Sequence, residues 1–175
     1  VESGARRAVV LGAGFIGLET AEALAGQGMS VTLVELAPHV LPPLEDELAW
    51  LIDEELRRIG IAVRSGTAAK AIEPSADHDR VVLDDGSTVD ADLIVASVGG
   101  RPDTEVFEQA GITCERGAIV VDEHGRTSAP GVWAVGDAVV SVDAVTGTRR
   151  PVALAGPANR AGRLVADDIL RPRRP

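Results

Sequence analysis

Three glycines, Gly12, Gly14 and Gly17, stand between a short apolar run and a helical pattern. In the spacing Gly-x-Gly-x-x-Gly, the first glycine permits a tight turn and the second lets a pyrophosphate approach the backbone. The third lets the helix lie close to the preceding strand, and the N–H groups at the helix start bind phosphate. The alternative is that the glycines only pack a helix against a sheet. Because an apolar run precedes the motif and another follows its helix, we expect a dinucleotide-binding turn.

The acidic residue Glu35 ends that next apolar run, about 20 residues after the first glycine. A carboxylate at this place accepts hydrogen bonds from the hydroxyls of the adenosine ribose and repels a 2′-phosphate. No arginine follows Glu35 closely. The sequence therefore predicts binding of NAD(H) rather than NADP(H).

A second candidate site is the pair Gly136 and Asp137, which follows the apolar run 132–135. The glycine permits a ligand to approach the end of a strand, and the carboxylate of Asp137 can accept hydrogen bonds from a polyol. Taken alone, a Gly-Asp pair is a turn as often as a ligand site.

Strand-like and helical patterns alternate along the chain, which is typical of βαβ units around a parallel sheet. Strands are expected at 8–11, 31–34, 61–63 and 92–98, and a hairpin at 80–89 turns at Gly86. Helices are expected at 15–25 and 44–59. These elements predict an α/β fold, with a Rossmann-like dinucleotide-binding domain whose parallel sheet carries helices on its faces and an antiparallel β-hairpin crossover.

The character of the chain changes near residues 114–117, where we expect a domain boundary. The predicted domains are residues 1–115 and residues 116–175, the second being part of another α/β domain. A short helix at 105–110, strands at 119–121 and 132–135, and a last helix at 156–170 are expected. The tail 171–175 is expected to be disordered.

The composition excludes several classes of protein. A formal net charge of −10 argues against nucleic acid as the main partner. The only cysteine, Cys114, excludes a disulfide framework and a cysteine-built zinc site, and we interpret it as a small packing residue. The apolar stretches are far shorter than the ~20 residues that a membrane helix needs. We therefore expect a cytoplasmic protein with no metal, nucleic-acid or membrane partner.

Four motifs in series resemble the FAD-dependent pyridine nucleotide-disulfide oxidoreductases. They are GAGFIGLETAEAL with VTLVE, then SVGGRPDT, TSAPGVWAVGDA and PVALAGPANRAGRLVADDI. The last of them is similar to the branch of coenzyme A-disulfide reductases, NADH oxidases and NADH peroxidases. Flavin-linked ferredoxin reductases are similar in the first motifs but usually carry a tryptophan-containing segment where this chain has residues 154–157.

The resemblance implies roles for particular residues. Glu19 resembles a glutamate beside the nicotinamide; the alternative is an acid that the helix dipole favours near the N-terminus. Gly99 resembles a glycine that lines the nicotinamide nucleotide, and Asp137 resembles an aspartate that hydrogen-bonds the ribitol of FAD. The implied NAD(H) residues are Gly12, Gly14, Phe15, Ile16, Gly17, Glu19, Glu35 and Gly99. The implied FAD residues are Gly136, Asp137, Leu154 and Ala155.

The departures from the family pattern concern whole segments. The family begins with a second Gly-rich FAD-binding half and, in this branch, a redox cysteine, and it ends with a dimerisation domain. None of these is found in the 175 residues. We therefore expect the chain to be the NAD-binding domain and the C-terminal half of a split FAD domain, cut from a homodimeric parent and prone to self-association.

The function that the resemblance implies is hydride transfer from NADH to FAD, and onward to a small-molecule disulfide or to O₂ or peroxide. No catalytic residue is assigned with certainty, Glu19 being the candidate. The alternatives are a flavin-dependent ferredoxin reductase and a non-catalytic dinucleotide-binding module.

Overall fold

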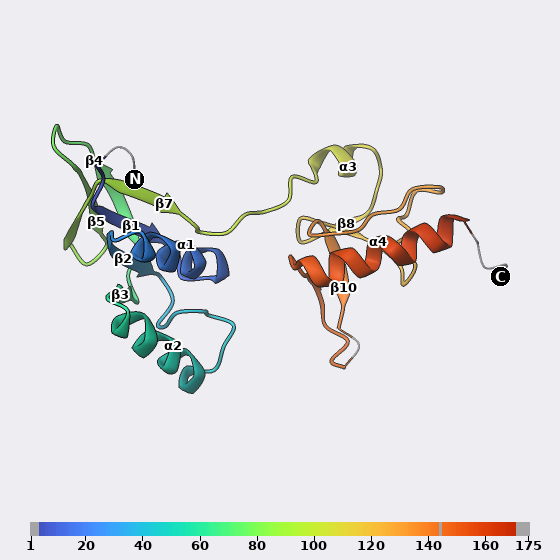
Figure 1. The fold of residues 1–175 in the computed structure, drawn as a ribbon. Helices are drawn as coiled ribbons and strands as arrows, with labels where there is room; N and C mark the ends of the chain where they lie inside the picture. Colours follow the sequence, from blue (N-terminus) through green and yellow to red (C-terminus); the bar gives the residue numbers. More distant parts are fainter. Residues whose placement is uncertain (1–3, 144, 171–175) are drawn as a thin grey trace. The chain divides into compact units, whose positions relative to one another are not determined.

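The computed structural model describes residues 4–143 and 145–170 and shows the predicted α/β fold (Figure 1). The tail 171–175, expected to be disordered, lies outside the described residues. The chain forms two compact units, which divide between Gly99 and Gly100. Within the described ranges, no helix is long and apolar enough to cross a bilayer. The expected cytoplasmic location stays a prediction.

The division between the units lies earlier in the chain than the predicted boundary at 115/116. The reason is the strand β8 (Cys114–Glu115), which pairs antiparallel with β9 (Ala118–Val120) through a tight turn at Arg116 and Gly117. This pairing places β8 in the sheet of the second unit. The short helix α3 (Glu105–Gln109), which the sequence predicted at 105–110, precedes this hairpin and belongs to the same unit.

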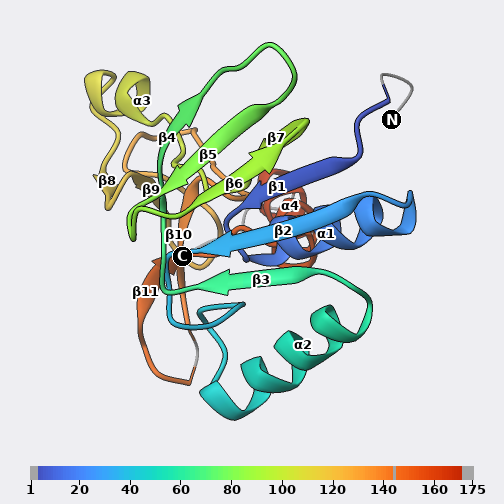
Figure 2. The same cartoon turned by 90° about the vertical axis from the view of Figure 1, so that its left-hand side faces the viewer.

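The first unit is built on a four-stranded parallel sheet in the order β3-β2-β1-β7 (Figure 2). Its strands are β1 (Arg7–Leu11), β2 (Ser30–Glu35), β3 (Ala62–Ser65) and β7 (Leu93–Ala96). The central strand β1 buries consecutive residues because both faces of the sheet are covered, so its sequence is apolar without alternation. The carboxyl ends of all four strands meet at one edge, where ligands bind in such sheets.

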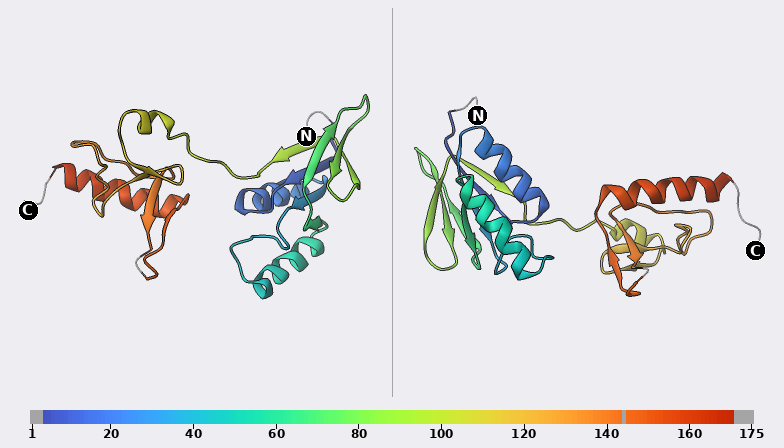
Figure 3. Two further views of the ribbon diagram at one scale, coloured as in Figure 1. Left: turned by 180° about the vertical axis from the view of Figure 1, so that it is seen from behind. Right: turned by 60° about the horizontal axis from the view of Figure 1, so that its bottom comes forward.

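Two helices cover one face of this sheet. They are α1 (Phe15–Gly26) and α2 (Asp46–Arg58), which lie next to each other in Figure 3. Val10 and Leu33 of the sheet pack in the same core cluster as Ala21 of α1 and Leu56 of α2. The acids of α2 lie in its first turn and its arginines in its last turn, as the helix dipole favours.

An antiparallel sheet covers the other face. Its strands are β4 (Ala69–Glu73), β5 (Asp79–Leu83) and β6 (Thr88–Ala91), in the order β4-β5-β6. Val9 and Val34 from the parallel sheet form a second core cluster with Val81 and Leu83 of β5. The predicted hairpin is therefore confirmed, and it packs on the sheet as a layer of its own.

The second unit contains a four-stranded sheet in the order β11-β10-β9-β8 and the helix α4 (Ala155–Leu170). The strands β10 (Val139–Val142) and β11 (Arg149–Pro151) complete that sheet. The predicted strand at 132–135 is wrong in this structure, because the segment forms only an isolated bridge between Arg126 and Trp133. An apolar run becomes a strand only where a neighbouring strand supplies a full ladder of partners.

A buried carboxylate connects that bridge to the last helix of the second unit. Asp168 of α4 is 7% exposed and accepts hydrogen bonds from Nε and Nη2 of Arg126 at 2.8 and 2.7 Å. It also accepts one from Nε1 of Trp133 at 3.0 Å. The Arg126 guanidinium, followed by the Trp133 indole, lowers the pKa of Asp168 below its ordinary value of 3.8. Asp168 therefore holds both sides of the bridge against α4.

We expect Asp168→Ala to lower the melting temperature of the second unit by several degrees, because it leaves the Arg126 guanidinium without its partner. Tryptophan emission in a Trp50→Phe background reports on Trp133. The exposed neighbour Asp167→Ala is the control and should leave the melting temperature unchanged. Because the folded pKa of Asp168 is lowered, its stabilisation is complete at neutral pH and is lost as the pH falls below 3.8. Equal melting temperatures for the two variants would contradict this role.

Candidate functional site

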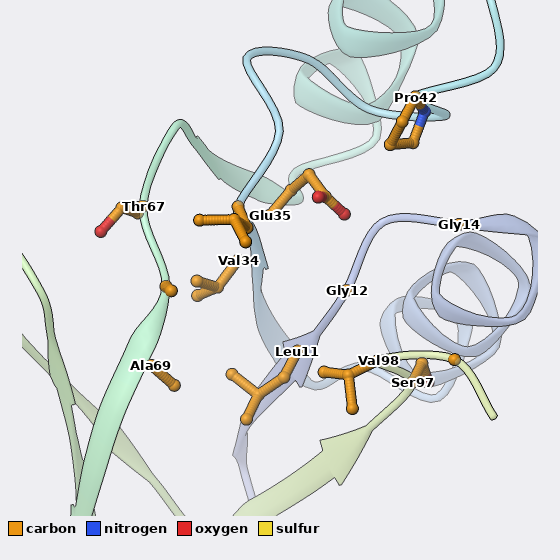
Figure 4. Close-up of a pocket in the computed structure, with 13 residues that line it drawn as sticks. Leu11, Gly12, Gly14, Val34, Glu35, Pro42, Thr67, Ala69, Ser97 and Val98 are labelled. Carbon is orange, nitrogen blue, oxygen red and sulfur yellow. The ribbon is translucent and has the colours of Figure 1, made fainter. Parts of the chain in front are cut away.

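A pocket of about 470 Å³ lies at the carboxyl ends of the strands of the parallel sheet (Figure 4). It brings together four of the residues that the sequence assigned to a dinucleotide, namely Gly12, Gly14, Glu35 and Gly99. The other lining residues are Leu11, Val34, Leu36, Pro42, Thr67, Ala68, Ala69, Ser97 and Val98. The pocket has the position that a nucleotide occupies in an open α/β sheet.

The first and third glycines of the motif are required by the fold itself. Gly12 has φ +94°, and a methyl group built on it would lie 2.5 Å from the carbonyl oxygen of Ser97. A methyl group built on Gly17 would overlap the carbonyl oxygen of Gly12. Gly12 therefore makes the tight turn after β1, and Gly17 lets α1 pack on that turn.

The second glycine has a different environment. A methyl group built on Gly14 meets no heavy atom within 4 Å, and the residue has φ −74° and ψ −174°, which any residue can adopt. Neither protein packing nor backbone conformation therefore requires a glycine here. In the described parts of the chain, no backbone acceptor is found for the N–H groups of residues 14–17. The start of α1 thus offers several free donors beside an empty space, as an anion site does.

The carboxylate of Glu35 is anchored to the Gly-rich turn. It is 9% exposed, and Oε2 accepts a hydrogen bond from the Ala13 N–H at 2.6 Å while Oε1 accepts one from the Ala37 N–H at 2.8 Å. Figure 4 shows its oxygens on the side of the pocket where Gly12 and Pro42 lie. A carboxylate has about four lone-pair positions. Glu35 can therefore hold the turn and still accept hydrogen bonds from ribose hydroxyls.

The side chains of three residues that the resemblance placed with the nucleotide do not line this pocket. Phe15 and Ile16 are 65% and 73% exposed at the start of α1. Glu19 and Phe15 line another pocket, of about 280 Å³, between α1 and α2. The structure thus does not bring Glu19 to the pocket at the Gly-rich turn, and its place beside a nicotinamide stays a prediction.

The residues assigned to FAD lie in the second unit. Gly136 has φ +96° and forms the turn before β10, and the neighbouring Asp137 is exposed. Leu154 is 52% exposed and precedes α4, where its carbonyl accepts the Ala158 N–H. Ala155 is the first residue of α4 rather than the last before it. The side chains of Asp137, Leu154 and Ala155 are exposed, and their contact with FAD stays a prediction.

Several residues that line the nucleotide pocket were not predicted from the sequence. Thr67 is 6% exposed, donates its hydroxyl hydrogen bond to Asp84, and precedes the wall residues Ala68 and Ala69. Pro42 comes from the loop after β2. Both segments follow strands of the parallel sheet. The rule that loops after the carboxyl ends of strands line such a pocket could have found them.

A family model described as pyridine nucleotide-disulphide oxidoreductase matches residues 1–162. An NADH oxidase of Methanocaldococcus jannaschii is 35% identical over 171 residues, which cover 96% of this chain and 38% of the relative.

Solved structures of other proteins have the same fold over nearly the whole of this chain. An NAD-dependent persulfide reductase from A. fulgidus has a TM-score of 0.94 and 39% identity, covering 99% of this chain and 32% of the other. A water-forming NADH oxidase from Lactobacillus brevis, solved with NADH, has a TM-score of 0.90 and 28% identity, covering 98% and 38%. An engineered NADPH oxidase derived from it scores the same at 27% identity. This chain spans about a third of the length of these relatives. With the family model matched over residues 1–162, the chain belongs to the pyridine nucleotide-disulphide oxidoreductase family.

Proposed function

We propose that this chain is the NADH-binding portion of an FAD-dependent oxidoreductase that passes hydride from NADH to FAD and on to a disulfide, O₂ or peroxide. The observation that carries the proposal is the pocket in which Gly12, Gly14 and Glu35 meet at the strand ends. Relatives described as NADH oxidase and NAD-dependent persulfide reductase support the reaction class. We also propose that residues 100–175, together with a partner half, complete the flavin domain.

The residues of the pocket have separate tasks in this proposal. The free N–H groups at the start of α1 bind the pyrophosphate, because they are unpaired and lie at the positive end of the helix dipole. Glu35 accepts hydrogen bonds from the adenosine ribose. In the second unit, Asp137 and the first turn of α4 would hold FAD, which accepts the hydride when it is bound.

Two features support a preference for NADH over NADPH. None of the described residues that line the pocket is lysine or arginine, and Glu35 places a negative charge in it. The engineered NADPH oxidase from the Lactobacillus brevis enzyme carries five substitutions, which remove one aspartate and introduce two arginines. Residues 35–42 of this chain contain the acidic Glu35 and no arginine, so they do not carry the charges that those substitutions introduce.

The proposal is tested on the 175-residue chain by calorimetric titration with NADH and by the flavin absorption band of the purified protein. We expect one NADH per chain and no retained FAD, because the sequence contains a single Gly-x-Gly-x-x-Gly motif, and each dinucleotide pyrophosphate needs such a turn. Failure to bind NADH would overturn the proposal. Stoichiometric flavin, or NADH oxidation faster than with free flavin, would show that the second unit holds FAD unaided.

A further inference from the structure

The loop between β2 and α2 contains a residue with an unusual backbone. Leu41 has φ +48° and is one of only two non-glycine residues with positive φ in the described ranges, the other being Arg116. Its side chain is 7% exposed. A left-handed conformation costs a residue with a bulky side chain free energy, and it persists only where surrounding contacts hold it.

The contacts of Leu41 lead directly to the Gly-rich turn. Its N–H donates to the carbonyl oxygen of Ala13 at 2.9 Å, and its own carbonyl accepts the Leu44 N–H at 2.9 Å. Pro42, the residue after Leu41 in the chain, lines the nucleotide pocket. The left-handed residue therefore lies at the point where the loop bends onto the Gly-rich turn.

Hydrogen bonds hold both peptides that flank Ala13, through its N–H on one side and its carbonyl on the other. Ala13 is fully buried, and Glu35 accepts its N–H at 2.6 Å while Leu41 holds its carbonyl. In a planar trans peptide, the carbonyl and the following N–H point in opposite directions. With its carbonyl held by Leu41, the peptide between Ala13 and Gly14 directs the Gly14 N–H to the side opposite that hydrogen bond. Gly14 lines the pocket, and no backbone acceptor is found for its N–H among the described residues.

We propose that Leu41 is a positioning residue for the dinucleotide phosphates: its left-handed backbone holds the Ala13 carbonyl and so presents the Gly14 N–H to the pyrophosphate. The inference rests on the proposed NADH site and adds to it. It assigns part of the phosphate affinity to the backbone conformation of a residue outside the glycine motif. Leu41 itself is expected to make no contact with the nucleotide.

The test compares two apolar substitutions that conserve volume. Leu41→Ile branches at Cβ and so resists the left-handed conformation, whereas Leu41→Met does not. We expect Leu41→Ile to weaken NADH and ADP binding by about tenfold. Leu41→Met should bind both within about twofold of the parent chain. Adenosine, which lacks the pyrophosphate, should bind all three chains equally in ligand-observed NMR.

Arg116→Ile is the matched control, because it places the same branched side chain at the other positive-φ residue, in the second unit. It should leave ADP affinity unchanged. Circular dichroism verifies folding, and Leu41→Gly, which adopts positive φ freely, replaces the isoleucine variant if that one unfolds. The folded glycine variant should keep its preference for ADP over adenosine.

Three results would overturn the inference. They are parental ADP affinity in Leu41→Ile, equal losses in the isoleucine and methionine variants, and loss of the ADP preference in a folded Leu41→Gly chain. If the parent chain itself binds no NADH, the proposed function fails instead. The two failures are therefore distinguishable.

Discussion

Replacing Gly14 with valine is expected to abolish NADH binding and leave the protein folded. A Cβ at this position meets no protein atom within 4 Å, and the backbone at φ −74° and ψ −174° suits any residue. The folded chain therefore accepts the side chain. The valine is expected to prevent pyrophosphate binding, because its side chain occupies the space through which the pyrophosphate must approach the free N–H groups of α1. We expect a loss of more than a hundredfold in affinity, or about 2.8 kcal/mol.

The measurement is a calorimetric NADH titration beside far-ultraviolet circular dichroism. Gly26→Val is the matched control, because Gly26 ends the same helix and a Cβ there also meets no atom within 4 Å. It should bind NADH normally. Gly17 cannot serve this purpose, since any side chain there overlaps the Gly12 carbonyl and disturbs the packing of α1. A Gly14→Val chain that binds NADH as the parent does would show that the site lies elsewhere.

The first unit could be predicted well from the sequence, because its signals are local. The run at β1 is apolar without alternation because both sheet faces are covered, and α2 shows a one-sided apolar pattern. Gly12 and Gly17 of the motif are each required by a close backbone contact, and Glu35 ends β2 as predicted. Such features depend on the residues themselves and on their nearest neighbours in the chain.

The features that could not be predicted depend on pairing between distant segments. Residues 132–135 have strand-like composition, but no strand forms without a neighbour along their length. Asp168 reaches Arg126 across the second unit, and nothing in the pattern of α4 marks this contact. Likewise, Leu41 carries no local signal of positive φ, since glycine or asparagine is the usual residue there.

The domain boundary shows the same limit. The change in composition near Cys114 predicts a boundary there, but the β8–β9 pairing places these residues in the second unit. The division after Gly99 comes three residues after the end of strand β7, whose parallel pairing with β1 completes the sheet of the first unit. Strand pairing, rather than composition, sets the boundary.

We expect the unsubstituted 175-residue chain to bind NADH at least about a hundredfold more tightly than NADPH. The 2′-phosphate of NADPH carries up to two negative charges and would enter a pocket whose one charged lining residue, among those described, is Glu35. Like charges brought together at a binding site cost several kcal/mol. Calorimetric titrations with both nucleotides at one ionic strength give the ratio directly.

The variant Glu35→Gln separates charge from hydrogen bonding at this residue. Glu35 accepts the N–H groups of Ala13 and Ala37 with its two oxygens, whereas a glutamine has one acceptor oxygen for both. We therefore expect NADH affinity to fall, because the turn loses an anchor and the ribose loses an acceptor. NADPH affinity should fall less, since the repulsion is removed as well, so the ratio should shrink below about tenfold.

The control is Glu73→Gln, which removes the same charge from an exposed position at the end of β4. It should leave the ratio of the two affinities unchanged, because exposed charges beyond a Debye length are screened at physiological salt. A parent chain that binds NADPH as tightly as NADH would refute the assignment of Glu35 to the ribose. A ratio that falls equally in both variants would trace the preference to net charge, whereas a fall in Glu35→Gln alone assigns it to the carboxylate at the end of β2.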